Sequence, residues 1–126
     1  MRSPEIKVVY RIWFVSDGKA FGKGPYELLK GIDHTGSLRQ AAMEMGMSYR
    51  KAWGLFKECE RKLGFPLIEK KVGGVGGGYS KITPEGKEFM KSYGKFYSEA
   101  EESINKIFHK NIGKFVKSQK TELKHL

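Results

Sequence analysis

The sequence predicts a mainly helical domain with small β-hairpins, and three observations lead to this fold class. Residues 37–63 contain two short amphipathic helices separated by a glycine turn. A stretch rich in β-branched and aromatic residues precedes them, and a lysine- and glycine-rich hairpin pattern follows over residues 65–83. From residue 84 to residue 110, apolar residues recur at helical spacing. This order predicts a winged helix-turn-helix with an N-terminal β-hairpin and a long C-terminal helix.

Composition limits the classes of protein to consider. A length of 126 residues and a hydrophobic content of 39% predict one domain with a real core. The net charge of +10 favours a polyanionic partner, although basic domains without such a partner are also common. The single cysteine, Cys59, excludes an intrachain disulfide and is expected to be a small buried core residue rather than a redox sensor or metal ligand. No apolar run could cross a bilayer and no signal peptide is recognisable, so we expect a cytoplasmic protein without membrane association.

The N-terminal residues 6–22 predict a β-hairpin. Residues 6–16 alternate between two faces and are rich in β-branched and aromatic side chains, as in a half-buried strand. The pair Asp17-Gly18 favours a tight turn, after which residues 19–21 return as a short second strand. We expect Trp13 to pack against the domain rather than to bind a ligand.

Three helices are predicted next, over about residues 25–35, 37–45 and 48–63. Pro25 suits an early helical position, and Ser37 and Ser48 are natural N-caps for the second and third helices. Glycines are expected to end the first two of these helices. The second helix has an apolar face of Leu38, Ala41, Ala42 and Met45, and the third has a matching face of Ala52, Leu55, Phe56, Cys59 and Leu63.

The helix-turn-helix pattern identifies candidate DNA contacts, because such a unit places its second helix in the major groove. Arg50 lies near the start of that helix, where an arginine can bond the O6 and N7 atoms of guanine. Gly54 is a poor helix former in mid-helix, which indicates that something approaches the helix closely there. On the outer face we expect Ser48, Tyr49, Arg50, Trp53 and Lys57, with Lys51 nearer the DNA backbone. Phosphate contacts are expected from Ser37, Arg39 and Gln40. For Trp53, packing against the wing or the first helix is the alternative interpretation.

Residues 65–83 predict the wing. Its tip is rich in glycine, but neither a Walker pattern nor a strand-GxGxxG-helix context is present, so a nucleotide-binding loop is not indicated. The functional interpretation is a flexible tip whose backbone approaches the minor groove or phosphates; a tip without any contact is the alternative. The wing residues assigned to DNA binding are Lys70, Lys71, Gly74, Gly76, Gly77 and Lys81.

The last predicted helix covers residues 84–110. Thr83 is its N-cap and Pro84 occupies its first position. At about 1.5 Å per residue the helix is longer than a small winged domain can cover, so part of its apolar stripe needs another surface. We expect a dimer interface, with a helix folded over its own core as the alternative, and residues 111–126 as a frayed basic tail. The interface residues are Phe89, Tyr93, Phe96, Tyr97, Ala100, Ile104, Ile107 and Phe108.

Several motifs carry a family resemblance. The segments GSLRQAA, MGMSYRKAW, LGFPLIEK, GGVGGG and ITPEGK resemble the DNA-binding domain of ModE-type molybdate regulators and, more distantly, the LysR-type winged helix-turn-helix. In the LysR comparison, Ala41 and Ala42 match the usual alanine pair, Ser48 the turn serine, and Leu63-Gly64 the end of the recognition helix. The resemblance covers about residues 26–108 and implies that the last helix pairs two subunits. ModE proteins also carry a C-terminal molybdate-binding region for which this chain leaves no room, so the resemblance implies the fold but no molybdate response.

The sequence therefore predicts a homodimeric, sequence-specific transcriptional regulator that binds double-stranded DNA and needs no cofactor or metal. A non-specific architectural DNA-binding protein is one alternative. A protein-interaction module that uses Trp53, Tyr49 and the wing is another. An enzyme is disfavoured, because no paired carboxylates, Cys-His or Ser-His arrangement, or metal-ligand spacing stands out. A separate effector-sensing subunit is left open.

Overall fold

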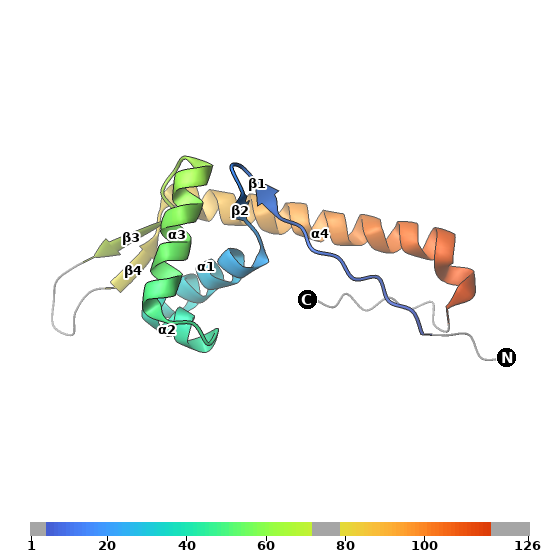
Figure 1. Ribbon diagram of the computed structural model, residues 1–126, viewed down its shortest axis with the longest axis horizontal. Helices are drawn as coiled ribbons and strands as arrows, with labels where there is room; N and C mark the ends of the chain where they lie inside the picture. The colour runs from blue at the N-terminus through green and yellow to red at the C-terminus, as the bar shows by residue number, and fades with distance from the viewer. Residues whose placement is uncertain (1–4, 72–78, 117–126) are drawn as a thin grey trace. The chain divides into compact units, whose positions relative to one another are not determined.

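A computed structural model describes residues 5–71 and 79–116, with the side chains of Lys71 and Tyr79 excepted (Figure 1). Its elements are β1 (Phe14–Val15), β2 (Lys19–Phe21), α1 (Lys23–Thr35), α2 (Leu38–Glu44), α3 (Tyr49–Leu63), β3 (Ile68–Lys71), β4 (Tyr79–Ile82) and α4 (Pro84–Ile112), followed by a short 3-10 turn (Gly113–Phe115). Over the described residues, four α-helices and two antiparallel hairpins confirm the predicted fold class. The chain divides into a unit of residues 12–92 and a unit formed by its two ends, and α4 contributes to both.

The helix ends follow from local chemistry. The Ser37 hydroxyl accepts a hydrogen bond from the Gln40 amide at 3.0 Å, and the Ser48 hydroxyl accepts one from the Lys51 amide at 3.1 Å. These bonds satisfy amides that a helix N-terminus otherwise leaves unpaired. Gly36 closes α1 in the left-handed region, at a φ of 75°, which glycine adopts without strain. The predicted caps are confirmed, and α1 begins two residues earlier than predicted.

The core of residues 12–92 lies between the first three helices. In the predicted apolar faces of α2 and α3, Leu55 and Leu63 are half-buried, Met45 is 41% exposed, and the other residues are buried. The physical reason for the exposure of Met45 is that α2 ends at Glu44, so Met45 is already a cap residue with non-helical backbone angles. Cys59 is buried, as predicted, and burial raises the pKa of its thiol to about 11. Fully buried core residues are Phe21, Leu28, Leu29, Ile32, Leu38, Ala42, Ala52, Phe56 and Leu67.

The N-terminal hairpin is much shorter than predicted. Only Phe14–Val15 pairs with β2, across a bulge, and residues 5–13 belong to no helix or strand. The predicted strand over residues 6–16 is wrong because the return strand has three residues before α1 begins, so the earlier residues have no partner in the hairpin. The turn itself is confirmed, since Asp17 and Gly18 both have positive φ angles.

Trp13 packs on its neighbours with one face of the ring, and 36% of the residue stays exposed. A Cβ atom placed on Gly22 would come within 2.6 Å of the Trp13 ring, so only glycine fits beneath the indole. The Lys19 ammonium lies 4.6 Å from the centre of the same ring. Trp13 is therefore held by its own hairpin.

The wing is an antiparallel pair of β3 and β4, in which Ile68 lies opposite Ile82 and Lys70 opposite Ser80. Residues 65–67 precede the strand and are not part of it, which corrects the predicted start of the wing. Leu67 is nevertheless fully buried. The tip residues Gly74, Gly76 and Gly77 lie outside the described residues.

The junction between the wing and α4 is tightly packed around Gly86. The Thr83 hydroxyl accepts a hydrogen bond from the Gly86 amide at 2.9 Å and donates one to the Pro66 carbonyl at 2.6 Å. A Cβ atom on Gly86 would lie 2.5 Å from the Leu67 carbonyl oxygen. That oxygen belongs to the backbone and accepts the Thr83 amide, so it has little freedom to move away.

We expect Gly86→Ala to lower the free energy of unfolding by about 1–3 kcal/mol, because the added methyl group overpacks this junction. Gly24→Ala in α1 is the matched control, since a Cβ atom there meets nothing within 4 Å. Urea denaturation of both variants measures the difference. Equal stability of the two would contradict the close packing at Gly86.

The last helix extends beyond its predicted end. It continues to Ile112, and the 3-10 turn follows, so residues 111–116 are not a frayed tail. Gly113 is buried and Val116 is 9% exposed, so packing of these two residues explains why regular structure continues past residue 110. Residues 117–126 of the predicted tail lie outside the described residues.

The apolar residues of α4 divide into covered and exposed groups. Phe89 packs edge-to-face against Phe14, Phe21 and Phe65, with ring centres 4.7–6.3 Å apart. Tyr93 is 1% exposed and Tyr97 9%, whereas Phe96 is 45% and Ile107 60% exposed. The prediction that all eight apolar residues of α4 face a second subunit is therefore too broad. Half-buried residues between these groups are Ala100, Ile104 and Phe108.

Candidate nucleic-acid interface

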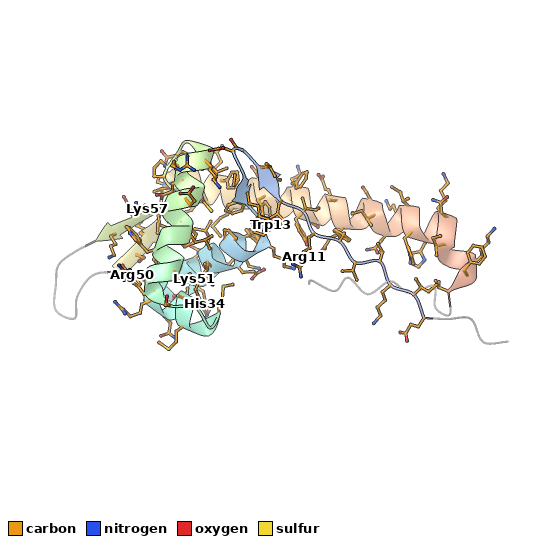
Figure 2. The ribbon with its side chains drawn as sticks, viewed as in Figure 1. Arg11, Trp13, His34, Arg50, Lys51 and Lys57 are labelled. Atoms are coloured by element: carbon orange, nitrogen blue, oxygen red, sulfur yellow. The ribbon has the colours of Figure 1, made fainter. Side chains whose placement is uncertain are left out.

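The outer side of α3 presents a row of cationic side chains. Arg50, Lys51 and Lys57 are exposed, and Figure 2 labels all three on this helix. Arg50 and Lys57 are seven residues apart, which is close to two helical turns, so they lie on the same side of α3. Among the described residues, no ion pair involves Arg50 or Lys51. Both cations are thus available to an external anion.

Two aromatic rings on α3 hold cations from three different elements. The Lys70 ammonium, from β3, lies 4.8 Å from the Tyr49 ring centre and 4.9 Å from the Trp53 ring centre. The Arg39 guanidinium, from α2, lies 4.5 Å from Tyr49, and the Lys57 ammonium lies 4.4 Å from Trp53. We call Arg39, Tyr49, Trp53, Lys57 and Lys70 the cation–aromatic cluster. It joins α2, α3 and the wing on one surface.

The cluster defines the surroundings of Trp53, whose ring contacts Lys70 of the wing, as the packing alternative expected, and Lys57 of α3 itself. Tyr49 and Trp53 are both half-buried, and each ring is covered by cations rather than inserted into the core. A cation over an aromatic face contributes about 0.5–1 kcal/mol at an exposed site. The rings therefore hold like charges close together, an arrangement that concentrates positive potential and suits a polyanion such as a phosphate backbone.

Glu60 fixes the wing to α3 and was not identified from the sequence. Its Oε2 atom accepts hydrogen bonds from the amides of Leu67 at 2.7 Å and Ile68 at 3.1 Å. Its Oε1 atom lies 3.2 Å from the Lys57 ammonium. One carboxylate thus sets the start of β3 and pairs with a cluster lysine. The only signal in the sequence is an acid on a basic helix, which is too common to indicate this role.

Other predicted site residues have local partners. The hydroxyls of Ser37 and Ser48 are occupied as helix caps, and the Gln40 side-chain amide donates to Glu44 at 3.4 Å. Lys81 is exposed on β4, where the strand register places it opposite Glu69. Lys71 lies in β3, but its side chain is outside the described set. The structure brings together Arg39, Tyr49, Trp53, Lys57 and Lys70, and it places Arg50 and Lys51 on the same helix.

At the far end of α3 the cations have partners within the chain. Arg61 donates two hydrogen bonds to the Glu58 carboxylate, and this contact lowers the pKa of Glu58. The Lys62 ammonium donates to the Lys19 carbonyl at 3.0 Å and so ties α3 to the N-terminal hairpin. The α3 cations that form no ion pair with described residues, Arg50 and Lys51, therefore lie in its first turn.

The described part of the chain contains no group of three or more histidine, cysteine or acidic residues that could hold a metal ion. Over the same residues, no helix has an apolar stretch sufficient to span a bilayer. The site consists of cations, aromatic rings and helix termini.

Comparison with known proteins identifies relatives of this arrangement. Residues 26–87 match the family described as bacterial regulatory helix-turn-helix protein, lysR family. The chain is 34% identical over 95 residues to the molybdenum-pterin-binding protein MopB of Rhodobacter capsulatus, covering 70% of this chain and 35% of MopB. It is 36% identical over 88 residues to the molybdenum transport protein ModE of Herbaspirillum seropedicae, covering 70% of this chain and 29% of that protein.

A third relative is the DNA-binding transcriptional dual regulator ModE of Escherichia coli strain K12, which is 36% identical over 66 residues. That match covers 52% of this chain and 25% of the relative. The chain thus spans between a quarter and about a third of the length of these relatives. The caps, the glycine-ended helices and the wing described above all lie in or beside the matched region. Residues 26–87 of this chain form a helix-turn-helix domain that matches the LysR-type family and is similar to the corresponding part of the ModE proteins.

Proposed function

We propose that this chain is a sequence-specific transcriptional regulator that binds double-stranded DNA through α3 and the wing. The observation that carries the proposal is the cation–aromatic cluster beside the exposed start of a helix-turn-helix recognition helix. A net charge of +10 supports it. The relatives are named as a DNA-binding regulator, a molybdenum transport protein and a molybdenum-pterin-binding protein, and none of these names describes an enzyme.

In this proposal different residues on and around α3 contact the bases and the phosphates. Arg50, free of ion pairs and close to the helix N-terminus, reads base edges in the major groove. The cluster cations and Lys51 bind phosphates and so fix the register of the protein on the duplex. Further phosphate contacts are assigned to Ser37, Gln40, Lys71, Lys81 and the wing-tip glycines Gly74, Gly76 and Gly77.

The regulator acts as a homodimer in the cytoplasm, where bacterial-type regulators meet DNA. The exposed Phe96 and Ile107 leave apolar surface on α4 that a second copy would cover. Half-buried Ala100, Ile104 and Phe108 border that surface. A two-fold dimer places its two recognition helices about one DNA turn apart, so its operator is a palindrome of matching spacing. A separate effector-sensing subunit stays a prediction of the sequence.

Selection of bound duplexes from random DNA tests the proposal. We expect a palindromic motif that keeps its preference over a scrambled duplex when the salt concentration is raised, because base contacts, unlike phosphate contacts, depend on sequence. If selected and scrambled duplexes weakened together and no motif emerged, the chain would be a non-specific architectural binder. Affinity for DNA no higher than that of an unrelated protein of equal charge would instead favour a protein-interaction module.

Gly54 gives a second test of the α3 surface. It lies in mid-helix, is exposed, and has nothing within 4 Å of the place where a Cβ atom would stand. We expect Gly54→Ala to raise the free energy of unfolding by about 0.5–1 kcal/mol, because alanine is the better helix former. If DNA approaches the helix here, the same variant binds DNA more weakly while being more stable. A variant that is stabilised and binds DNA normally would show that no ligand closely approaches Gly54.

A further inference from the structure

The N-terminal residues 5–11 form an extended segment outside the helices and strands. Among the described residues, no backbone hydrogen bond joins this segment to any other part of the chain. Its sequence, EIKVVYR, is nevertheless rich in β-branched and aromatic residues, which favour strands. A segment of this kind resembles an unpaired edge strand, which presents a row of free N–H and C=O groups to another chain.

Its side chains also remain incompletely covered. Ile6 is 42%, Val8 37% and Val9 62% exposed. Tyr10 is half-buried, and partial burial together with the nearby Glu101 and Tyr97 of α4 raises the pKa of its hydroxyl. The segment and the C-terminal part of α4 belong to the same compact unit (Figure 1). The segment therefore groups with the C-terminal part of α4 but keeps exposed apolar surface that a second copy of the segment would cover.

We propose that residues 5–11 pair antiparallel with the same residues of a second copy and form a two-stranded ribbon across the dimer axis, an inference that rests on the homodimer proposed above. A two-fold ribbon centred on Val8 places Val8 opposite its own copy and Ile6 opposite Tyr10 of the other chain. These residues share one face of the strand, because side chains alternate. Of this face, Tyr10 interacts with Glu101 and Tyr97 of α4, and the ribbon would make the face continuous across both chains.

The charges favour this register over its neighbours. Centring on Val8 brings Glu5 opposite Arg11 twice in each dimer. Moving the two-fold centre from Val8 to Lys7 would place Lys7 opposite its own copy, and moving it to Val9 would place Lys7 opposite Arg11. Like charges directly opposite each other destabilise an antiparallel pair, whereas opposite charges stabilise it. No ion pair among the described residues uses Glu5, Lys7 or Arg11 within its own chain.

Disulfide trapping of the full chain tests the register. Residues directly opposite in an antiparallel pair have Cα atoms about 4.5–5.5 Å apart, which a disulfide can bridge, whereas diagonal neighbours are about 7–8 Å apart. We therefore expect Val8→Cys to give a covalent dimer under mild oxidation near pH 8. Val9→Cys is the matched control, because Val9 is more exposed and would react more readily in random collisions. Cys59 does not interfere, since it is 4% exposed and its pKa is about 11.

Charge reversal tests the pairing without a covalent bond. We expect Glu5→Lys and Arg11→Glu each to raise the dissociation constant of the dimer by about tenfold, because each change places two pairs of like charges opposite one another. The double variant E5K/R11E keeps the native net charge and restores opposite-charge pairs, so its dissociation constant should return toward the native value. Sedimentation equilibrium measures all four proteins.

Two results would overturn the ribbon while leaving the proposed regulator intact. One is that the native chain dimerises but the Val9→Cys variant crosslinks as well as the Val8→Cys variant. The other is a dimer that neither single charge reversal weakens. A native chain that stays monomeric at every concentration, and also on its selected DNA, would overturn the homodimer itself and the ribbon with it.

Discussion

Arg50→Ala is expected to weaken binding to the selected DNA site by about 1–3 kcal/mol and to relax the sequence preference at one base pair of each half-site. Arg50 is exposed, lies in the first turn of α3, and forms no ion pair with any described residue. A bidentate contact to guanine made by this side chain would be lost in the variant. The affinity for a scrambled duplex should fall much less, because there the variant loses one positive charge near the phosphates but no base contact.

Lys51→Ala is the matched comparison for Arg50→Ala. Both positions are exposed, adjacent in sequence and free of ion pairs among the described residues, so the two variants remove the same charge from the same turn. We assign Lys51 to the DNA backbone. Its loss should weaken selected and scrambled duplexes alike and reduce the slope of log affinity against log salt by about one.

The pair of variants separates base reading from charge. Competition titrations of the selected and scrambled duplexes at two salt concentrations give both quantities. Equal losses on both duplexes for Arg50→Ala would assign Arg50 to the backbone. If Lys51→Ala instead lost the preference for the selected duplex over the scrambled one, base reading would be assigned to Lys51. Either outcome would change the assignment of residues while keeping α3 as the DNA-binding helix.

Much of the fold could be predicted because it depends on residues close in sequence. Ser37 and Ser48 cap helices through amides three residues away, and Gly36 ends α1 through a conformation that suits glycine. The apolar faces of α2 and α3 follow from helical periodicity alone. Met45 departs from that periodicity only because the helix ends one residue earlier.

The N-terminal strand shows what local propensity leaves out. Residues 6–16 have the composition of a strand, but a strand also needs a partner of equal length. The returning strand, Lys19–Phe21, ends where α1 begins, so the chain offers a partner only to Phe14–Val15. The strand prediction therefore failed through a length limit set by the next helix.

The candidate site was predictable residue by residue but not as an assembly. The sequence identified Tyr49, Trp53 and Lys70 separately. Lys70 lies over both rings because of the way the wing packs back against α3. Sequence periodicity does not predict such a contact. Similarly, helical spacing places Tyr93 and Phe96 in one apolar stripe, yet the first is 1% and the second 45% exposed. Which part of a stripe is covered depends on the neighbouring segments.

Removal of the Glu60 carboxylate is expected to have the largest effect on the wing. In Glu60→Ala the amides of Leu67 and Ile68 both lose their acceptor, and these residues are 0% and 4% exposed, so water cannot easily replace it. A buried donor left unpaired costs about 1–3 kcal/mol, and hydrogen bonds to a charged acceptor are the stronger kind. We expect the free energy of unfolding to fall by about 2–4 kcal/mol.

Glu58→Ala is the control for Glu60→Ala. Glu58 lies two residues away on the same helix and is exposed, and its ion pairs with described residues are those to Arg61 and Lys62. Its replacement removes the same negative charge from α3 but leaves no buried amide unpaired, so stability should remain near that of the native chain. Urea denaturation compares the two variants, and Glu60→Gln, which retains one oxygen acceptor, should fall between them.

The DNA affinity of these variants shows what the Glu60 contact does for function. Both changes make α3 more positive, so charge alone predicts tighter binding of any duplex by both variants. If Glu60 positions Lys57 and the start of β3 for phosphate contact, Glu60→Ala should bind the selected duplex more weakly than Glu58→Ala does, under conditions where both are folded. Equal affinity and equal stability of the two variants would mean that the wing holds its place without this carboxylate. Weaker binding in a folded Glu60→Ala protein would identify Glu60 as a positioning residue of the interface that never touches DNA itself.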